Sequence, residues 1–316
     1  MMKSKAAALT VAERCRSILG ANSQAHLNTI KADSKGGLVI CSKSEIHTSK
    51  VHYIFKRGKP YLWVHEGDLH NTNIIIDERG SLSVSNVVPG PLMGLLKSIR
   101  KLPARVALAG DVIPLKDDKV QMVTENLRES ILSEYEKATQ ASYAVTALLS
   151  SASANCRSRC EILQEILGKS ENYAVYKFNI RSCTYVDGSG HSHDLELQNV
   201  DAPKAEQLLS FSAKLIDGIN QSQARRRALM LFCFEEYNAT VRDALMLSID
   251  RKGFDVLGKV AQQATNNDGL STMQYTWKEF RFSFEEQASD LEAFCSRLIE
   301  LEEKTLQSVK SYSGLG

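Results

Sequence analysis

The part of the sequence that most constrains the fold runs from residue 44 to residue 88, where short apolar runs alternate with turn signals. In these runs, β-branched and aromatic side chains recur at a period of two, which is typical of antiparallel strands. A turn with Gly58 and Pro60 separates the first two runs, and the polar elbow Asp68–Ile74, on which a short helix could start, precedes the third. This order predicts the beginning of a small β-barrel. The three runs are Val51–Phe55, Tyr61–Val64 and Ser81–Val88.

Segments on either side of this stretch predict the rest of the barrel. Residues 25–43 contain two apolar runs around a Lys-Gly-Gly turn, and residues 104–112 alternate again. Residues 173–186 form a long alternating run that ends in a glycine-rich turn with His191 and His193. These segments predict the remaining barrel strands.

The other segments predict a mixture of helices and strands. Residues 116–168 have apolar residues at helical spacing and predict helices within a first domain at residues 1–199. Residues 200–316 predict a second domain, with helices at both ends and strands on both sides of a D-R-x-G-F-D motif that starts at Asp250. The predicted fold class is α+β, a small β-barrel followed by a small α+β domain.

Composition argues against several classes of function. The chain has 316 residues, enough for two domains, and its net charge of +2 gives no reason to expect nucleic acid as a partner. No apolar run approaches the roughly 20 residues of a membrane span. The seven cysteines are odd in number and scattered, which favours reduced thiols in an intracellular compartment. Cys156 and Cys160, four apart on an expected helix, are either a metal or redox pair or ordinary helix residues.

The order of the motifs resembles the flavin-binding split-barrel superfamily, and within it the bacterial haem-degrading split-barrel proteins and their plant relatives. The segment from Ala244 to Asp255 resembles the small DUF2470-like domain of haem-oxygenase-like plant proteins and glutamyl-tRNA-reductase-binding proteins. The resemblance implies that the barrel is a split β-barrel. It covers most of the chain except roughly residues 120–168. Relatives have a shorter helical excursion there, so the resemblance implies that the helices of residues 116–168 are an insertion in the first domain. In the barrel it is carried by Ser49, Val51, Tyr53, Gly58, Pro60, Leu62, Leu69, His70, Thr72, Asn73, Ile74, Asp77, Arg79, Ser81, Leu82 and Val84.

The resemblance implies haem or another tetrapyrrole as a ligand, with FMN as the alternative cofactor. It also implies a homodimer, a partner enzyme of tetrapyrrole metabolism, and the chloroplast as the compartment. No signal segment or transit peptide is evident in the sequence, so the cytosol is the alternative.

Histidines are the first candidates for ligands of haem iron. All seven histidines precede residue 194. His70 occupies the polar elbow, and His191 and His193 occupy the glycine-rich turn, so all three are expected to be exposed. We take His70 and His191 as candidate iron ligands, with Asn73 and His193 as further cofactor-binding residues. The alternative is that these side chains only cap or hydrogen-bond loops.

Two motifs depart from what a haem-degrading or flavin enzyme of this superfamily would carry. Relatives often have N-x-D-H after the first helix of the second domain, where this chain has Asn220-Gln221-Ser222-Gln223. Neither Ser nor Gln can replace an imidazole as an iron ligand or proton relay. The candidate donors to a flavin phosphate are few: Ser49, Lys50, Arg79 and Arg105. The run Arg225–Arg227 is either a phosphate or partner patch or a solvated helix face.

The sequence contains no G-x-S-x-G, P-loop or H-E-x-x-H motif. Two hypotheses follow. The first is a non-catalytic regulator that binds haem, another tetrapyrrole or a partner enzyme. The second is a haem-degrading or flavin-dependent oxidoreductase of the same fold, of the haem-oxygenase-like or pyridoxamine-phosphate-oxidase-like kind. The lost histidine, the insertion and the few phosphate donors favour the first.

Overall fold

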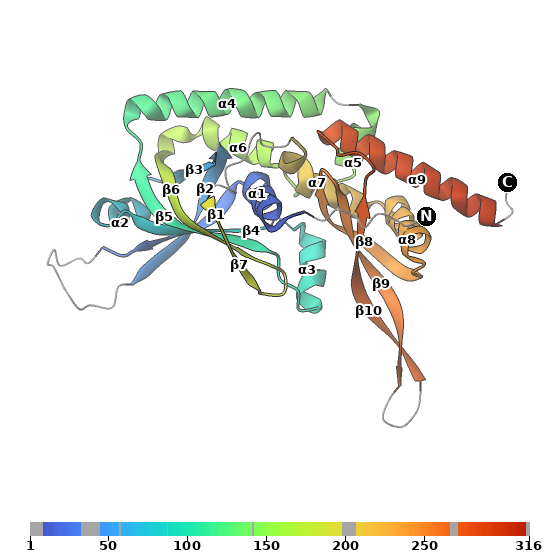
Figure 1. Cartoon of the computed structure of the whole chain (residues 1–316). Coiled ribbons are helices and arrows are strands. Elements are labelled where there is room, and N and C mark those ends of the chain that lie inside the picture. The colour runs from blue at the N-terminus through green and yellow to red at the C-terminus, as the bar shows by residue number, and fades with distance from the viewer. Residues whose placement is uncertain are drawn as a thin grey trace.

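The computed structural model describes residues 9–32, 45–56, 58–86, 88–140, 142–197, 207–265 and 271–313. Figure 1 shows a β-barrel on one side, a second lobe built on a smaller sheet on the other, and helices that bridge the two. The predicted strand at residues 38–41 lies outside the described residues. None of the described helices is long and apolar enough to cross a membrane.

The barrel is a closed antiparallel sheet. Strands β1 to β6 are hydrogen-bonded in the order β3-β2-β1-β4-β5-β6, and β3 pairs with β6 to close the circle. The short β7 pairs with β6 outside the closed circle. The prediction of a split-barrel fold is therefore confirmed at the level of topology. These strands are β1 (Gln24–Ile30), β2 (Ile46–Lys56), β3 (Lys59–His65), β4 (Arg79–Ser85), β5 (Arg105–Pro114), β6 (Tyr173–Val186) and β7 (Ser192–Leu195).

Apolar side chains that recur at a period of two in the strands fill the barrel interior. Tyr53, Leu62 and Phe178 are fully buried in one hydrophobic core with side chains of the other strands. At the β5–β6 bulge, a Cβ on Gly110 would lie 2.0 Å from the carbonyl oxygen of Asn179, so only glycine fits there. Burial of these alternating side chains is what fixes the register of the barrel.

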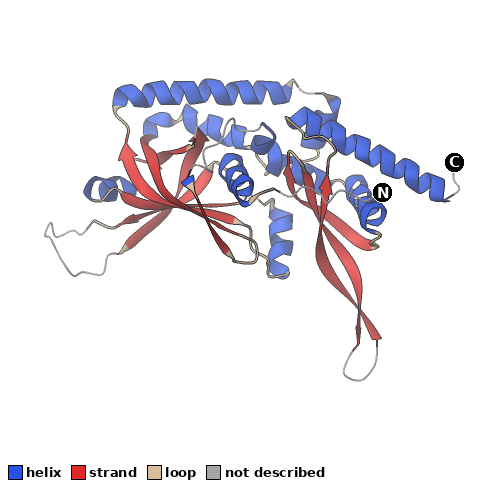
Figure 2. Cartoon of the chain, in the orientation of Figure 1, coloured by secondary structure: helices blue, strands red, loops and turns tan. Residues whose placement is uncertain are grey.

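The second lobe contains a three-stranded antiparallel sheet in the order β10-β9-β8. Figure 2 shows that its β9–β10 hairpin extends well beyond the helices around it. The turn between β8 and β9 is the D-R-x-G-F-D motif, in which Gly253 has φ +148° and a Cβ would lie 1.9 Å from the carbonyl oxygen of Phe282. The strands are β8 (Val241–Asp250), β9 (Gly253–Thr265) and β10 (Ser271–Ser283).

The helices connect the two sheets. Helix α1 starts with a capping box, in which Thr10 and Glu13 each accept a hydrogen bond from the other's backbone N–H. Long helix α4 passes over the barrel toward α9 (Figure 1). The helices are α1 (Val11–Ala21), α2 (His70–Ile76), α3 (Gly90–Ser98), α4 (Asp117–Thr139), α5 (Tyr143–Ser150), α6 (Arg159–Gly168), α7 (Gln207–Gln221), α8 (Gln223–Tyr237) and α9 (Leu291–Ser313), with a 3-10 turn at Ser170–Asn172.

The predicted insertion is helical, and its helices do not stand apart from the second lobe. A single hydrophobic core joins Leu127 of α4, Leu148 of α5 and Leu163 of α6 to buried residues of α7, α8, α9 and the small sheet. The same core reaches the outer face of the barrel at Ile54 and Trp63. The insertion therefore shares its apolar contacts with residues 207–298, and the boundary at residue 199 stays a prediction.

Candidate functional site

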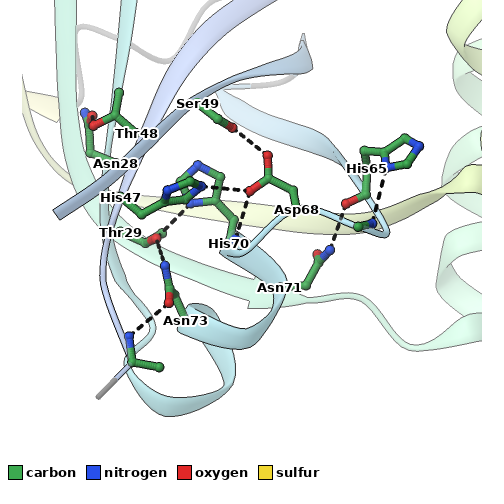
Figure 3. Close-up of polar contacts among 12 residues, drawn as sticks. Asn28, Thr29, His47, Thr48, Ser49, His65, Asp68, His70, Asn71 and Asn73 are labelled. Carbon is green, nitrogen blue, oxygen red and sulfur yellow. Dashed lines mark hydrogen bonds and ion pairs between the residues drawn. The ribbon is translucent and has the colours of Figure 1, made fainter. Parts of the chain in front are cut away.

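A cluster of polar side chains lies where α2 meets the first two barrel strands (Figure 3). The antiparallel register places Thr29 of β1 directly opposite His47 of β2. The loop after β3 brings Asp68 to this point, and α2 begins at His70. The rings of His47 and His70 lie 4.5 Å apart between centroids. We call His47, Asp68 and His70 the elbow cluster.

Asp68 is the centre of the elbow cluster. Its Oδ1 accepts hydrogen bonds from the backbone N–H of His70 at 2.9 Å and from Nε2 of His47 at 3.1 Å, while Oδ2 accepts one from the Ser49 hydroxyl at 2.7 Å. Partial burial raises the pKa of this carboxyl, but these hydrogen bonds outweigh it, so the pKa of Asp68 is lowered. The cluster therefore contains a carboxylate at neutral pH.

His70 is fully buried, so the expectation that it is exposed is wrong. Its Nδ1 shares a 2.7 Å hydrogen bond with the hydroxyl of Thr29, and its Nε2 is buried without a hydrogen-bond partner among the described residues. Burial lowers the pKa of His70 to about 4, against the opposing charge of Asp68. The His70 imidazole is therefore neutral at pH 7.

Asn73, which we predicted to bind a cofactor, connects α2 to the end of β1. Its side-chain amide donates to the Thr29 hydroxyl at 2.9 Å and accepts from the backbone N–H of Ala32 at 3.0 Å. The side chain is almost fully buried. These contacts are those of a structural residue, and its cofactor role stays a prediction.

A second histidine–aspartate cluster occupies the glycine-rich turn between β6 and β7. Asp187 Oδ2 lies 3.4 Å from Nδ1 of His191 and 3.8 Å from Nε2 of His193. The two imidazole side chains are 77% and 44% exposed, as expected for this turn. We call these three residues the turn cluster. It lies away from α2 (Figure 1), so the structure does not bring His70 and His191 together.

A cavity of about 770 Å³ lies between the barrel, the start of α3, and helices α6 and α7. Its lining includes His52 of β2, which sequence analysis had not singled out. The Nδ1 of His52 is buried without a hydrogen-bond partner among the described residues, and burial lowers its pKa, so the ring is neutral at pH 7. The lining residues are Gln24, His52, Val88, Pro89, Gly90, Pro91, Ser153, Asn155, Cys156, Arg157, Ile162, Glu165, Ile166, Lys169, Tyr173, Ala213 and Asp217.

Cys156 and Cys160 do not form the pair that their spacing suggested. Cys156 precedes the helix, which is capped by Ser158, and it lines the cavity; Cys160 is buried in the helical core. Their thiols point to separate acceptors, the carbonyl of Ala213 and the carboxylate of Glu134. Burial raises the pKa of Cys156 to about 11, so this thiol stays protonated at neutral pH.

The four predicted phosphate donors do not converge. Ser49 and Lys50 are consecutive in β2, so their side chains point to opposite faces, and Ser49 is bonded to Asp68. Arg79 and Arg105 lie at opposite ends of the β4–β5 ladder, about 20 Å apart at the usual rise per strand residue. Arg79 also forms an ion pair with Asp77. These donors form no common phosphate site within one chain.

The motif that departs from N-x-D-H has a structural role here. The Asn220 side chain donates to the carbonyl of Met246 at 2.9 Å and accepts from its N–H at 2.7 Å, which fastens α7 to β8 at an irregularity in the β8–β9 pairing. Ser222 caps α8 by accepting from the N–H of Arg225. These contacts fix the junction of α7 and α8.

The arginine run after this motif is largely engaged in ion pairs. Arg225 bonds both carboxylate oxygens of Glu302, and Arg226 pairs with Asp243. A run whose first two members are neutralised in this way is a poor phosphate site, so we favour the alternative of a helix face.

The D-R-x-G-F-D turn joins the second lobe to the barrel. Arg251 and Lys252 of this turn bond the Glu13 carboxylate of α1 at 2.7 and 3.1 Å. Burial raises the pKa of Glu13, but its hydrogen bonds to the Thr10 backbone and to these two cations outweigh that effect and hold the pKa at about 2. Asp250 receives a two-point hydrogen bond from Arg281 of β10. This motif therefore stabilises the contact between lobes.

No protein-family model and no curated protein matches this sequence. Among solved structures, a haem-binding protein from Mycobacterium smegmatis is similar over 95% of this chain and 99% of its own, with 17% identity and a TM-score of 0.52. The chain has the split-barrel fold. Weaker matches are ChuZ from Campylobacter jejuni, with 15% identity over 64% of this chain and 66% of that one (TM-score 0.39), and a pyridoxinephosphate-oxidase-family protein from Clostridium acetobutylicum, with 10% identity over 61% and 99% (TM-score 0.33).

Within this split barrel, the sequence indicated Ser49, His70 and Asn73 as site residues but gave no such indication for His47, Asp68 or His52. One signal was present: His47 precedes the strand Val51–Phe55 by an even spacing, which places it on the face of Val51 and Tyr53. The pairing of β1 with β2, which sets Thr29 against His47, was not available from the sequence.

Proposed function

We propose that the protein binds haem or a related tetrapyrrole and regulates rather than converts it. The observation that carries this proposal is the 770 Å³ cavity with the imidazole of His52 in its lining. Its volume falls within the range of small-molecule and cofactor sites. Val88, Ile162 and Ile166 supply apolar lining for a macrocycle. A neutral histidine is a common axial ligand of haem iron.

The rim of the cavity has cations for the carboxylates of a tetrapyrrole. Arg157 and Lys169 both line the cavity, and both contact Glu165, at 2.9 and 3.0 Å. Propionate groups would compete with Glu165 for these two cations. Because the Cys156 thiol stays protonated at neutral pH, His52 is the better axial ligand of the two.

His191, predicted from the sequence as an iron ligand, and His193, predicted as a further cofactor-binding residue, are the rival ligands. They are exposed and near one carboxylate, and neither residue lines the His52 cavity. A macrocycle held there would remain in water unless a second protein covered it. We therefore rank the His52 cavity above the turn cluster. His70 is lower, because no macrocycle can reach a fully buried ring without displacing α2.

Absorbance titration of the full-length protein with haemin tests the proposal. We expect a saturable Soret shift that His52→Ala abolishes and that His26→Ala, on an exposed face of β1, leaves unchanged. A shift lost instead in His191→Ala/His193→Ala would place the haem at the turn. A stoichiometric FMN titration would favour the flavin-dependent oxidoreductase.

Turnover is tested separately on the loaded protein. With a reductant and oxygen present, we expect the Soret band to persist, because Ser222, which caps α8, and Gln223 occupy the positions where relatives carry an acid and a histidine. Loss of the band with formation of a linear tetrapyrrole would favour the alternative, a haem-degrading enzyme.

We further propose a homodimer, with a partner enzyme of tetrapyrrole metabolism and the chloroplast as compartment. Apolar side chains around α2 support the dimer: Leu69, Ile75 and Ile76 are 55%, 83% and 66% exposed, and Ile46 at the start of β2 is 68% exposed. Light scattering after gel filtration should give twice the chain mass of 35.1 kDa. A monomer's mass would contradict the dimer.

A further inference from the structure

The elbow cluster combines two imidazoles and one carboxylate at close range. One ligand atom from each of His47, Asp68 and His70 lies within 4.8 Å of the other two. Two nitrogen donors with one carboxylate oxygen suit divalent transition metals such as zinc or ferrous iron, whereas calcium and magnesium prefer oxygen ligands alone. The cluster thus has the ligand types of a mononuclear transition-metal site.

The spacing is close to what such an ion requires. With metal–ligand bonds of about 2.0–2.2 Å, the ligand atoms of a tetrahedral ion lie about 3.3–3.6 Å from one another. Nε2 of His47 and Oδ1 of Asp68 are already 3.1 Å apart. Small side-chain movements would therefore suffice to close the site around an ion, without displacement of β1 or β2.

Neighbouring side chains form hydrogen bonds to two of the three candidate ligands. Ser49 holds the second oxygen of Asp68, and Thr29 holds Nδ1 of His70. Hydrogen bonds of this kind fix the orientation and tautomer of metal ligands. They leave Nε2 of His70 buried, with the backbone of Leu27 as a neighbour of the ring but without a well-formed hydrogen bond to any described residue. A buried polar atom without a partner is costly, and coordination would remove that cost.

Access comes from one side. The side chains of His47 and Asp68 are 21% and 20% exposed, while His70 closes the site from the interior. An ion could enter past the first two residues and keep water in its remaining coordination positions, as zinc and ferrous sites with three protein ligands do.

We propose that His47, Asp68 and His70 bind one divalent transition-metal ion at the junction of β1, β2 and α2. The proposal is independent of the haem cavity, since none of the three residues lines it. The alternative is a hydrogen-bond network that only fastens α2 to the barrel. A measurement of metal affinity separates these alternatives. If the residues form only a hydrogen-bond network, substituting them does not change the affinity of the protein for a metal ion.

The test is isothermal titration of tag-free, chelator-treated, full-length protein with Zn²⁺, paralleled by Co²⁺ monitored through its visible d–d absorption. We expect one equivalent to bind. His47→Gln and Asp68→Asn, which alter partly exposed side chains, should each weaken binding by more than about 100-fold, at or beyond the range seen when outer-shell partners of metal ligands are mutated. Bound Zn²⁺ should also raise the melting temperature of wild type but of neither variant.

Two controls separate this site from other histidines. His26→Gln removes an exposed imidazole on β1, and His191→Gln/His193→Gln removes the turn cluster. Both should bind Zn²⁺ as wild type does. The proposal is overturned if no ion binds, if His47→Gln and Asp68→Asn bind normally, or if only the turn variant loses binding. Haemin titration of His47→Gln tests the haem proposal separately, because His47 does not line the His52 cavity. Normal haemin binding by this variant would show that the haem proposal stands even if the metal proposal fails.

Discussion

The elbow cluster and the turn cluster contain the same three side chains, two histidines and one aspartate, in opposite surroundings. At the elbow, a buried His70, Thr29 and Ser49 surround the carboxylate of Asp68. At the turn, the Asp187 carboxylate accepts hydrogen bonds from the backbone N–H groups of Ser189 and His191. It lies beside the two exposed histidine rings of this cluster. The two clusters therefore have the same composition but differ in burial and in the hydrogen bonds that neighbouring side chains make to them.

The difference shows why spacing in sequence is a poor guide to which histidine has a special role. His191 and His193 are two residues apart in a glycine-rich turn and drew attention for that reason. His47 and His70 are 23 positions apart (70 minus 47), and only strand pairing and the start of α2 bring them together. A preorganised pair of ligands arises from packing, which the turn lacks.

The largest expected effect is the loss of the buried ring. His70→Ala should lower the free energy of unfolding by about 2–4 kcal/mol, because it leaves a cavity and removes one of the two hydrogen-bond partners of the Thr29 hydroxyl. The measurement is urea unfolding followed by circular dichroism. His191→Ala, at an exposed ring, is the matched control and should stay within about 0.5 kcal/mol of wild type. Equal losses in both variants would contradict the contrast between the clusters.

The next effect is a dependence of stability on pH. Burial lowers the pKa of His70 from 6.5 to about 4 in the folded protein. Between these values the unfolded chain binds a proton that the folded chain does not, so stability falls as pH drops from about 6.5 to about 4. In metal-free protein, wild type should lose about 1–2 kcal/mol more than His70→Gln over this interval, after allowance for solvent screening.

Unfolding curves at pH 7 and pH 5 check this prediction. Asp68 does not interfere, because its lowered pKa affects stability only below its usual value of 3.8. His191→Gln is the control from the turn cluster and should follow the wild-type pH dependence. Parallel curves for wild type and His70→Gln would show that the buried ring does not titrate in this way.

Much of the fold could be predicted because its signals are local. The alternating runs Val51–Phe55 and Tyr61–Val64 became β2 and β3, and the helical spacing at residues 116–168 became α4, α5 and α6. The predicted polar elbow became α2. What could not be predicted was the sharing of one core by α4–α6 and the second lobe, since it depends on contacts between distant segments.

The site was less predictable for the same reason. The polar residues of the elbow predicted that His70 is exposed to solvent. Instead, His70 faces β1, where its Nδ1 shares a hydrogen bond with the Thr29 hydroxyl, which also accepts one from the Asn73 amide. The cavity around His52 forms between β2 and two helices that lie more than 100 residues later in the chain. Period-two patterning placed His52 in a strand but gave no indication of what would pack against that strand.

A smaller effect tests the support of the elbow cluster. Thr29→Val keeps the shape of the side chain but removes the partner of His70 Nδ1 and of the Asn73 amide, both buried. We expect a loss of about 1–2 kcal/mol in urea unfolding. Thr184→Val, which removes an exposed hydrogen bond to Asp194 beside the turn, is the matched control and should cost about 0.5 kcal/mol or less. A cost at Thr29 no larger than at Thr184 would show that the elbow network is not a stabilising one.

The smallest effect is expected from the turn cluster itself. His191→Ala/His193→Ala removes both exposed rings while leaving the backbone bonds to Asp187 in place. Because neither ring is buried, the free energy of unfolding should change by no more than about 0.5 kcal/mol. The same urea unfolding experiment measures it, with His70→Ala as the contrasting variant. A loss above about 1 kcal/mol would mean that the turn depends on its histidines as the elbow does, and that exposure alone does not separate the two clusters.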